Sequence, residues 1–365
     1  MAGGLQQLAR CVARALASSA EIRKLGIWGQ MDPRSTEPFI ERVVQTYAHP
    51  GVDLDVRTFG GSRVELSSAI AATSLRGSYD RIMYLLLNQA VLSLLPGHPP
   101  YSVWEIGWEL MTGPLPWWKC RALRHADVLL SISRNTTAVA SLHNPQLPAA
   151  RVVHLCTEPP LFSKTPLHDP VAAELYDPAR RQHSVLIVGN MYRGMLYKGH
   201  QQLIAAWPQV VGGCPSAELW IASGGDGQLE LEAQARMLPR HVAKKIRFLG
   251  YLDQQALHDR YRQCRVFAMP STGEGFGLVF VEAARYGIPC IGGKYDAVKE
   301  IVVHNETGLL VEQHPHDLAL ACLRLLNDDR LAKRLGNAGR QRYLENFRFC
   351  HFRDRLLRAL DLDST

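Results

Sequence analysis

The 365-residue sequence lacks the cysteine patterns of disulfide-rich and zinc-binding proteins. Its eight cysteines form no C-x-x-C pair and have no histidine partners at zinc spacing. This scatter predicts reduced thiols in a cytoplasmic protein and indicates no metal site. No G-x-G-x-x-G follows the apolar run that ends at Val188, which disfavours a dinucleotide cofactor.

Long apolar runs are also missing. The segment Ile82–Leu95 is too short to span a bilayer and is interrupted by Asn88 and Gln89. The segment Met1–Ala20 contains arginines, no acidic residue, and apolar residues at helical spacing. It could imitate an organellar transit peptide, but we favour an amphipathic helix packed on a sheet.

The charge balance is basic, with a formal net charge of +7. A basic surface suits phosphate-bearing ligands or an anionic membrane. The sequence has no nucleic-acid-binding motif, so nucleic acid is not expected as a partner.

Short apolar runs alternate with helical patterns along the whole chain, which predicts an α/β protein with doubly wound parallel sheets. The length suggests about two domains. We place an N-terminal domain at 1–165, a C-terminal domain at 166–345, and a final helix at 346–365 that returns to the first domain.

One stretch, Ser271–Ile301, carries the clearest chemistry. A loop of small residues, including Gly275 and Gly277, leads into a predicted helix, Leu278–Tyr286. Free amides and the helix dipole at such an N-terminus favour an anion such as phosphate.

Two glutamates border this helix. Glu274 lies in the loop and Glu282 eight positions later, so their carboxylates can be about 12 Å apart along the helix. That separation fits a nucleotide, with one carboxylate able to bind hydroxyls of a sugar and the other those of a ribose.

The pattern around Glu274 and Glu282, G-E-G-F-G-L-V-F-V-E-A-A-R-Y-G-I-P, resembles the E-x7-E motif of retaining GT-B glycosyltransferases of family four, the glycosyl transferases group 1. The resemblance implies two Rossmann-like domains facing a cleft. It also implies transfer of a hexose from a UDP- or GDP-linked sugar to a glycan or lipid-linked acceptor in polysaccharide or glycolipid synthesis. Neither a cofactor nor a metal is implied.

The same resemblance assigns residues to roles. Glu274 would hold the transferred sugar, Glu282 the ribose, and the loop the diphosphate; the loop residues are Gly275, Phe276, Gly277 and Leu278. The turn after Val188 resembles the family's G-R-x-x-x-x-K-G. It predicts that Lys198 and Arg193 bind the diphosphate, although Asn190 replaces the arginine next to the glycine.

The first half of the chain departs from the family pattern. The sequence enters a predicted helix at Leu5, so we expect the family's first strand to be missing and Gly3 and Gly4 to be the remains of its glycine loop. Where the family carries a histidine, this chain has Ile106-Gly107-Trp108-Glu109. Glu105 and Glu109 are then the polar candidates on the acceptor side; Trp104 and Trp108 could stack on a sugar or fill the core.

The segment Met111–Arg124 combines apolar and aromatic residues with basic ones. It suits peripheral contact with an anionic membrane, or it forms an interior loop under the acceptor site. Two other functions remain open for the whole chain: an inactive nucleotide-sugar-binding protein, and a phosphorylase on the same fold.

Overall fold

A computed structural model describes residues 4–29, 33–105, 110, 113–157 and 176–362. The chain forms two compact units, which we call the N-terminal unit (residues 2–168 and 348–365) and the C-terminal unit (residues 169–347). Among the described helices, none is both long and apolar enough to cross a bilayer.

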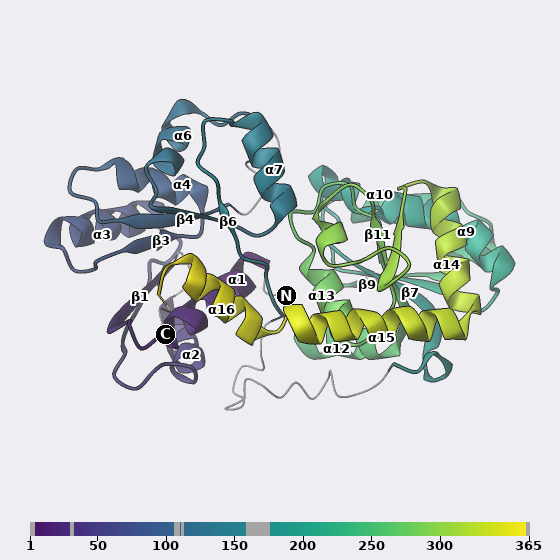
Figure 1. The fold of residues 1–365 in the computed structure, drawn as a ribbon. Coiled ribbons are helices and arrows are strands. Elements are labelled where there is room, and N and C mark those ends of the chain that lie inside the picture. The colour runs from purple at the N-terminus through teal and green to yellow at the C-terminus, as the bar shows by residue number, and fades with distance from the viewer. Residues whose placement is uncertain (1–3, 30–32, 106–109, 111–112, 158–175, 363–365) are drawn as a thin grey trace. The chain divides into compact units, whose positions relative to one another are not determined.

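The N-terminal unit alternates helices with short parallel strands (Figure 1). Its elements are α1 Gly4–Ala17, β1 Lys24–Gly29, α2 Pro33–Gln45, β2 Asp53–Thr58, α3 Arg63–Arg76, β3 Ile82–Tyr84, α4 Leu87–Ala90, η1 Val91–Leu94, β4 Tyr101–Glu105, α6 Trp117–Arg124, β5 Val128–Ser131, α7 Arg134–His143, β6 Arg151–Val152 and α16 Phe349–Ala359.

The strands of this unit belong to two sheets. β1 pairs with β2, and β3, β4, β5 and β6 form a separate parallel sheet in that order. Alternation along a sequence does not determine which strands pair, so this division was not predicted. Within the described residues, no strand precedes α1.

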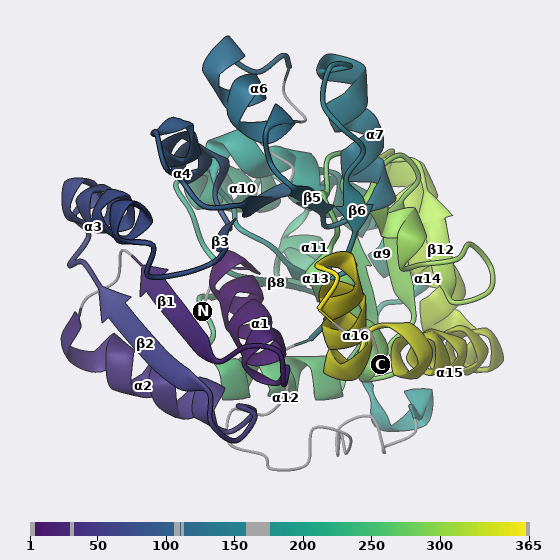
Figure 2. The ribbon, with the colours of Figure 1, turned by 60° about the vertical axis from the view of Figure 1, so that its left-hand side comes forward.

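Two helices from opposite ends of the sequence pack together in this unit (Figure 2). α1 contacts α16, and the apolar face of α1 also packs against α2 and β1. The guanidinium of Arg151 donates to the carbonyl of Ala359, 2.7 Å away. The apolar spacing of α1 therefore forms the packed amphipathic helix that it predicts.

Trp104 fills the core of the N-terminal unit. Its side chain is 1% exposed, its ring stacks on Phe352 of α16 with 6.3 Å between centroids, and its indole N–H donates to the sulfur of Met83. Of the two roles open for Trp104, the structure supports packing; Trp108 lies outside the described residues.

The C-terminal unit contains one parallel sheet in the order β12-β11-β10-β7-β8-β9. Its elements are η2 Pro178–Arg180, β7 Gln182–Val188, η3 Arg193–Lys198, α9 His200–Gly213, β8 Glu218–Ala222, α10 Gln228–Arg236, α11 Arg240–Ala243, β9 Ile246–Gly250, α12 Gln254–Gln263, β10 Cys264–Met269, α13 Leu278–Arg285, β11 Cys290–Gly293, η4 Ala297–Glu300, β12 Gly308–Val311, α14 Pro315–Asn327 and α15 Asp329–Asn346.

The strand order of this sheet reverses between β7 and β10, which lie side by side. In open α/β sheets, ligands bind outside the carboxyl ends of the strands at such a switch point. The loops that follow β7 and β10 are therefore the place to look for a site.

Candidate active site

The switch point brings together one cation and one carboxylate. Lys198, at the end of η3, places its Nζ 2.5 Å from Oε1 of Glu274, which lies in the loop after β10. Only 14% of the Lys198 side chain and 12% of the Glu274 side chain are exposed. Burial alone would lower the pKa of Lys198, but the neighbouring Glu274 raises it, so the ammonium is charged at neutral pH.

The loop that carries Glu274 is held by Asp296, the N-cap of η4. One Asp296 oxygen accepts from the backbone N–H of Glu274 at 2.9 Å, and the other accepts from the N–H of Val298 at 3.0 Å. Asp296 is 2% exposed, and this burial raises its pKa to about 6. Its role had no assignment from sequence; the only signal was an aspartate after the Gly292-Gly293 pair.

The helix after this loop, α13, begins without a side-chain cap. Gly277 occupies the N-cap position with φ of 93°, a conformation that side chains other than glycine rarely adopt. Its neighbour Phe276 is buried and its ring packs edge-on against Phe347. Because Gly277 has no side chain, the N-cap residue itself supplies no acceptor to the amides at the start of α13, which suits an anion site.

Glu282 lies on α13 and is partly exposed. The hydroxyl of Tyr261 donates to Glu282 Oε2 at 2.9 Å. Burial raises the pKa of Glu282, while the Tyr261 hydrogen bond and the Arg285 charge act against this shift. The side chain keeps acceptor capacity for a hydroxyl group.

Arg193 is placed differently from Lys198. It begins η3 and its side chain is 66% exposed, with Nε 2.9 Å from Oε1 of Glu230 on α10. Its backbone N–H donates to Asp226. The structure therefore brings Lys198 and Glu274 together, whereas Arg193 pairs with a surface carboxylate.

The turn after β7 is hydrogen-bonded to the turn after β8. The N–H of Met191 donates to the carbonyl of Gly224 at 3.0 Å, and Ser223 Oγ donates to Oδ1 of Asn190. A Cβ on Gly225 would lie 2.5 Å from the Met191 backbone, so only glycine fits there. Asn190, which replaces the family's arginine, thus supports the loop.

His200 was missed by the sequence analysis. It opens α9 directly after Lys198-Gly199 and is fully buried. Burial, with a smaller effect from Lys198, lowers the pKa of His200 to about 4, so its ring is neutral. A histidine in the first turn after a lysine–glycine pair is the signal that could have identified it.

The N-terminal candidates are only partly described. Gly4 begins α1, while Gly3 and Glu109 lie outside the described residues. Glu105 ends β4 and is 3% exposed; burial raises the pKa of its carboxyl to about 7. Its Oε2 accepts no hydrogen bond from the part of the chain that the structure describes.

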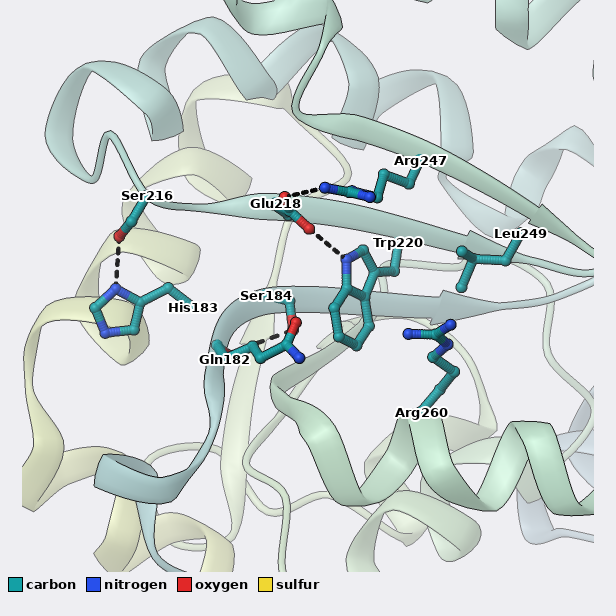
Figure 3. A pocket seen from close by; sticks show the side chains of 9 residues that line it. All are labelled: Gln182, His183, Ser184, Ser216, Glu218, Trp220, Arg247, Leu249 and Arg260. Carbon is teal, nitrogen blue, oxygen red and sulfur yellow. Dashed lines mark hydrogen bonds and ion pairs between the residues drawn. The ribbon is translucent and has the colours of Figure 1, made fainter.

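A pocket of about 430 Å³ lies toward the other end of the same sheet (Figure 3). Glu218 links two side chains that line the pocket: it accepts a hydrogen bond from the Trp220 indole at 3.0 Å and forms an ion pair with Arg247 at 2.7 Å. Arg260 covers the Trp220 ring. Because β7 enters at this pocket and Lys198 follows its far end, the pocket is separate from the Lys198–Glu274 site.

Comparison with known proteins finds a family match in the C-terminal unit. Residues 179–342 match the family model described as Glycosyl transferases group 1. The match includes Ser271–Ile301 and agrees with the resemblance found there.

Two curated relatives align with parts of the chain. Phosphatidyl-myo-inositol mannosyltransferase of Mycobacterium tuberculosis is 34% identical over 181 residues, which cover 47% of this chain and 46% of the relative. The GDP-mannose-dependent monoacylated alpha-(1-6)-phosphatidylinositol monomannoside mannosyltransferase of Corynebacterium glutamicum is 34% identical over 151 residues, covering 39% and 38%. The alignments therefore span less than half the length of these relatives.

A solved structure matches nearly the whole chain. Sucrose-phosphate synthase from Thermosynechococcus elongatus superposes with a TM-score of 0.73 at 21% identity, covering 98% of this chain and 93% of that chain. This likeness confirms the predicted GT-B fold.

Proposed function

We propose that the protein is a retaining glycosyltransferase that moves a hexose from a nucleotide-diphosphate sugar to a glycan or lipid-linked acceptor. The observation that carries this proposal is the Lys198–Glu274 pair, 2.5 Å apart at the switch point of the sheet and in the loop that enters α13. A buried cation beside a helix N-terminus suits a diphosphate, and a buried carboxylate suits sugar hydroxyls.

Donor binding would divide this ion pair between two parts of one ligand. The diphosphate would replace Glu274 as the partner of Lys198, and Glu274 would accept hydrogen bonds from hydroxyls of the sugar. Glu282 would hold the ribose from further along α13. Because the two charges already face each other, one donor can satisfy both without leaving a buried charge unpaired.

In the proposed reaction, the bond between the anomeric carbon and the diphosphate oxygen breaks, and a bond from that carbon to the acceptor oxygen forms on the same face. The proton of the acceptor hydroxyl passes to the departing diphosphate. Lys198, the first amides of α13 and Arg193 would stabilise the charge that develops on the leaving group. We propose that these groups suffice without a metal, so turnover is expected to survive treatment with EDTA.

The acceptor is proposed to bind the N-terminal unit near the carboxyl end of β4, where Glu105 lies. Because burial raises the pKa of Glu105 to about 7, its carboxyl is partly protonated near neutral pH and can donate or accept a hydrogen bond with an acceptor hydroxyl. The identity of the acceptor would follow from transfer assays with glycans and lipid-linked sugars.

A donor screen tests the proposal. The purified protein is incubated with UDP- and GDP-linked hexoses, and release of free nucleotide and protection from thermal unfolding are followed. GDP-mannose is the first donor to try, because one relative is named for its dependence on it. If one donor protects the protein from unfolding and is itself slowly hydrolysed, the result supports transferase activity.

One observation favours a second candidate, an inactive nucleotide-sugar-binding protein. Arg193, one of the two expected diphosphate cations, pairs with Glu230 at the surface. This alternative predicts stabilisation by a donor without nucleotide release, even when acceptor extracts are added.

A further inference from the structure

α6 and the end of α7 build a joint surface on the N-terminal unit, seen at the top of Figure 1. The N–H of Leu115 donates to Oδ1 of Asn144 at 2.8 Å. The side chain of Gln146 donates to the sulfur of Cys120 at 3.1 Å. These bonds tie residues 113–125 to residues 142–147, and we call this surface the α6–α7 face.

α6 presents an apolar and basic stripe on this face. Three exposed side chains lie at helical spacing on one side of α6: Trp117, Arg121 and Arg124. The residues just before the two arginines, Cys120 and Leu123, are buried. Trp117 is 76% exposed, which rules out an interior position for its side chain. Leu142, at the end of α7, adds a second apolar side chain that is 78% exposed.

The charge of the face is almost entirely positive. Residues 113–125 and 142–147 contain three lysines and arginines and no acidic residue, and the nearest acidic residue along the chain is Asp127. Asp127 is engaged, because its Oδ2 accepts from the backbone N–H of Tyr101. Within the described ranges, no ion pair involves Arg121 or Arg124. Their charges are therefore available to an anionic partner.

A pocket of about 580 Å³ opens between the two segments. Both arginines line it, together with Trp117, His125 and Gln146. Guanidinium groups bind phosphate oxygens through paired hydrogen bonds, and a tryptophan next to them suits the boundary between headgroups and acyl chains.

We propose that the α6–α7 face docks on an anionic phospholipid bilayer. Arg121 and Arg124 bind lipid phosphates, while Trp117 and Leu142 enter the acyl boundary. The two exposed apolar side chains beside the arginines favour a bilayer over nucleic acid, which would use the charges alone. Docking is independent of the proposed transferase activity, because it needs neither a donor nor turnover.

Co-sedimentation of the full chain with vesicles tests this proposal. Vesicles of phosphatidylcholine with 30% phosphatidylglycerol are expected to bind the protein at low salt, and pure phosphatidylcholine vesicles much less. Each arginine near an anionic surface strengthens binding by about 5.5-fold. The double variant Arg121→Gln/Arg124→Gln should therefore bind about thirty-fold more weakly. Trp117→Ala should lose about ten-fold.

Matched controls separate the face from overall charge and apolarity. Arg330→Gln/Lys333→Gln removes the same charge from exposed positions on α15. Met237→Ala removes an apolar side chain that is 87% exposed after α10. Both controls should bind vesicles like the unchanged protein.

Three results would overturn the proposal. The controls could weaken binding as much as the α6–α7 variants do. Pure phosphatidylcholine could bind as well as the anionic vesicles. Inorganic phosphate or duplex DNA, at the same ionic strength, could release the protein from vesicles, which would identify a free phosphate or a nucleic acid as the ligand.

Discussion

The carboxylate of Asp296 accepts a hydrogen bond from the backbone N–H of Glu274, with 2.9 Å between the two atoms. The N–H of Ala297, in turn, donates to the Glu274 carbonyl at 3.2 Å. The peptide groups before and after Glu274 are therefore both held, while its side chain pairs with Lys198. Asp296 is a positioning residue for the carboxylate that we propose holds the sugar.

Asp296→Asn should lower donor turnover about ten-fold and change its pH profile. The charged groups that face Asp296 are Glu274 and Lys198, with the neutral hydroxyl of Tyr197 beside them. Because the pKa of Asp296 is raised to about 6, its carboxylate becomes protonated as the pH falls through 6. It then accepts weaker hydrogen bonds from the backbone amides of Glu274 and Val298. The unchanged protein should therefore lose activity below pH 6.

The measurement is nucleotide release between pH 5 and 8. In Asp296→Asn the decline near pH 6 should disappear, since an amide does not titrate there. Asp259→Asn, on the surface of α12, is the control and should keep the original profile. An unchanged decline in Asp296→Asn would show that another group causes it.

Lys198→Ala and Glu274→Ala should each lower turnover by about 100-fold or more, as expected for loss of one preorganised electrostatic group. Each single change also leaves a buried partner charge unpaired. Thermal unfolding must accordingly be followed beside the kinetics. Lys294→Ala, at an exposed lysine, is the control. Near-normal rates in both site variants would refute the site assignment.

Glu230→Gln should increase the affinity for the donor. If Arg193 binds the diphosphate, its ion pair with Glu230 must first break. Breaking an exposed ion pair of this kind costs less than about 1 kcal/mol. The KM for the donor is expected to fall by up to about five-fold, with kcat nearly unchanged. Arg193→Ala should raise the same KM; no effect of either change would place Arg193 outside the donor site.

Glu105→Gln should stabilise the protein by an amount that grows as the pH rises from about 4.5 through 7. The folded-state pKa of Glu105, about 7, lies above its ordinary value of 4.5, so folding favours the protonated form. The stability that this carboxyl contributes is complete below about pH 4.5 and is lost as the pH rises through 7. At pH 8, glutamine avoids the cost of burying the ionised carboxylate, which is about 3 kcal/mol.

Denaturant midpoints at pH 5 and pH 8 measure this effect. Glu41→Gln, at an exposed position on α2, should change neither midpoint. An equal gain for Glu105→Gln at both pH values would contradict the assigned pKa.

Much of the C-terminal unit could be predicted from the sequence. The expected alternation of short strands with helices is present there, and the expected helix Leu278–Tyr286 is found as Leu278–Arg285. These elements depend on local apolar spacing and on breakers such as Gly287, which the sequence displays directly. The E-x7-E segment likewise pointed to the family model that matches residues 179–342, because its residues are close together in the chain.

Only the tertiary structure decided which of these residues meet. Lys198 and Glu274 are 76 positions apart and Asp296 lies 22 positions from Glu274, so their contacts depend on the register of β7, β10 and β11. The same holds for the partner of Arg193, the division of the N-terminal strands into two sheets, and the exposure of Trp117. Local patterns determine helices and strands, whereas pairing between distant segments depends on how the whole chain packs.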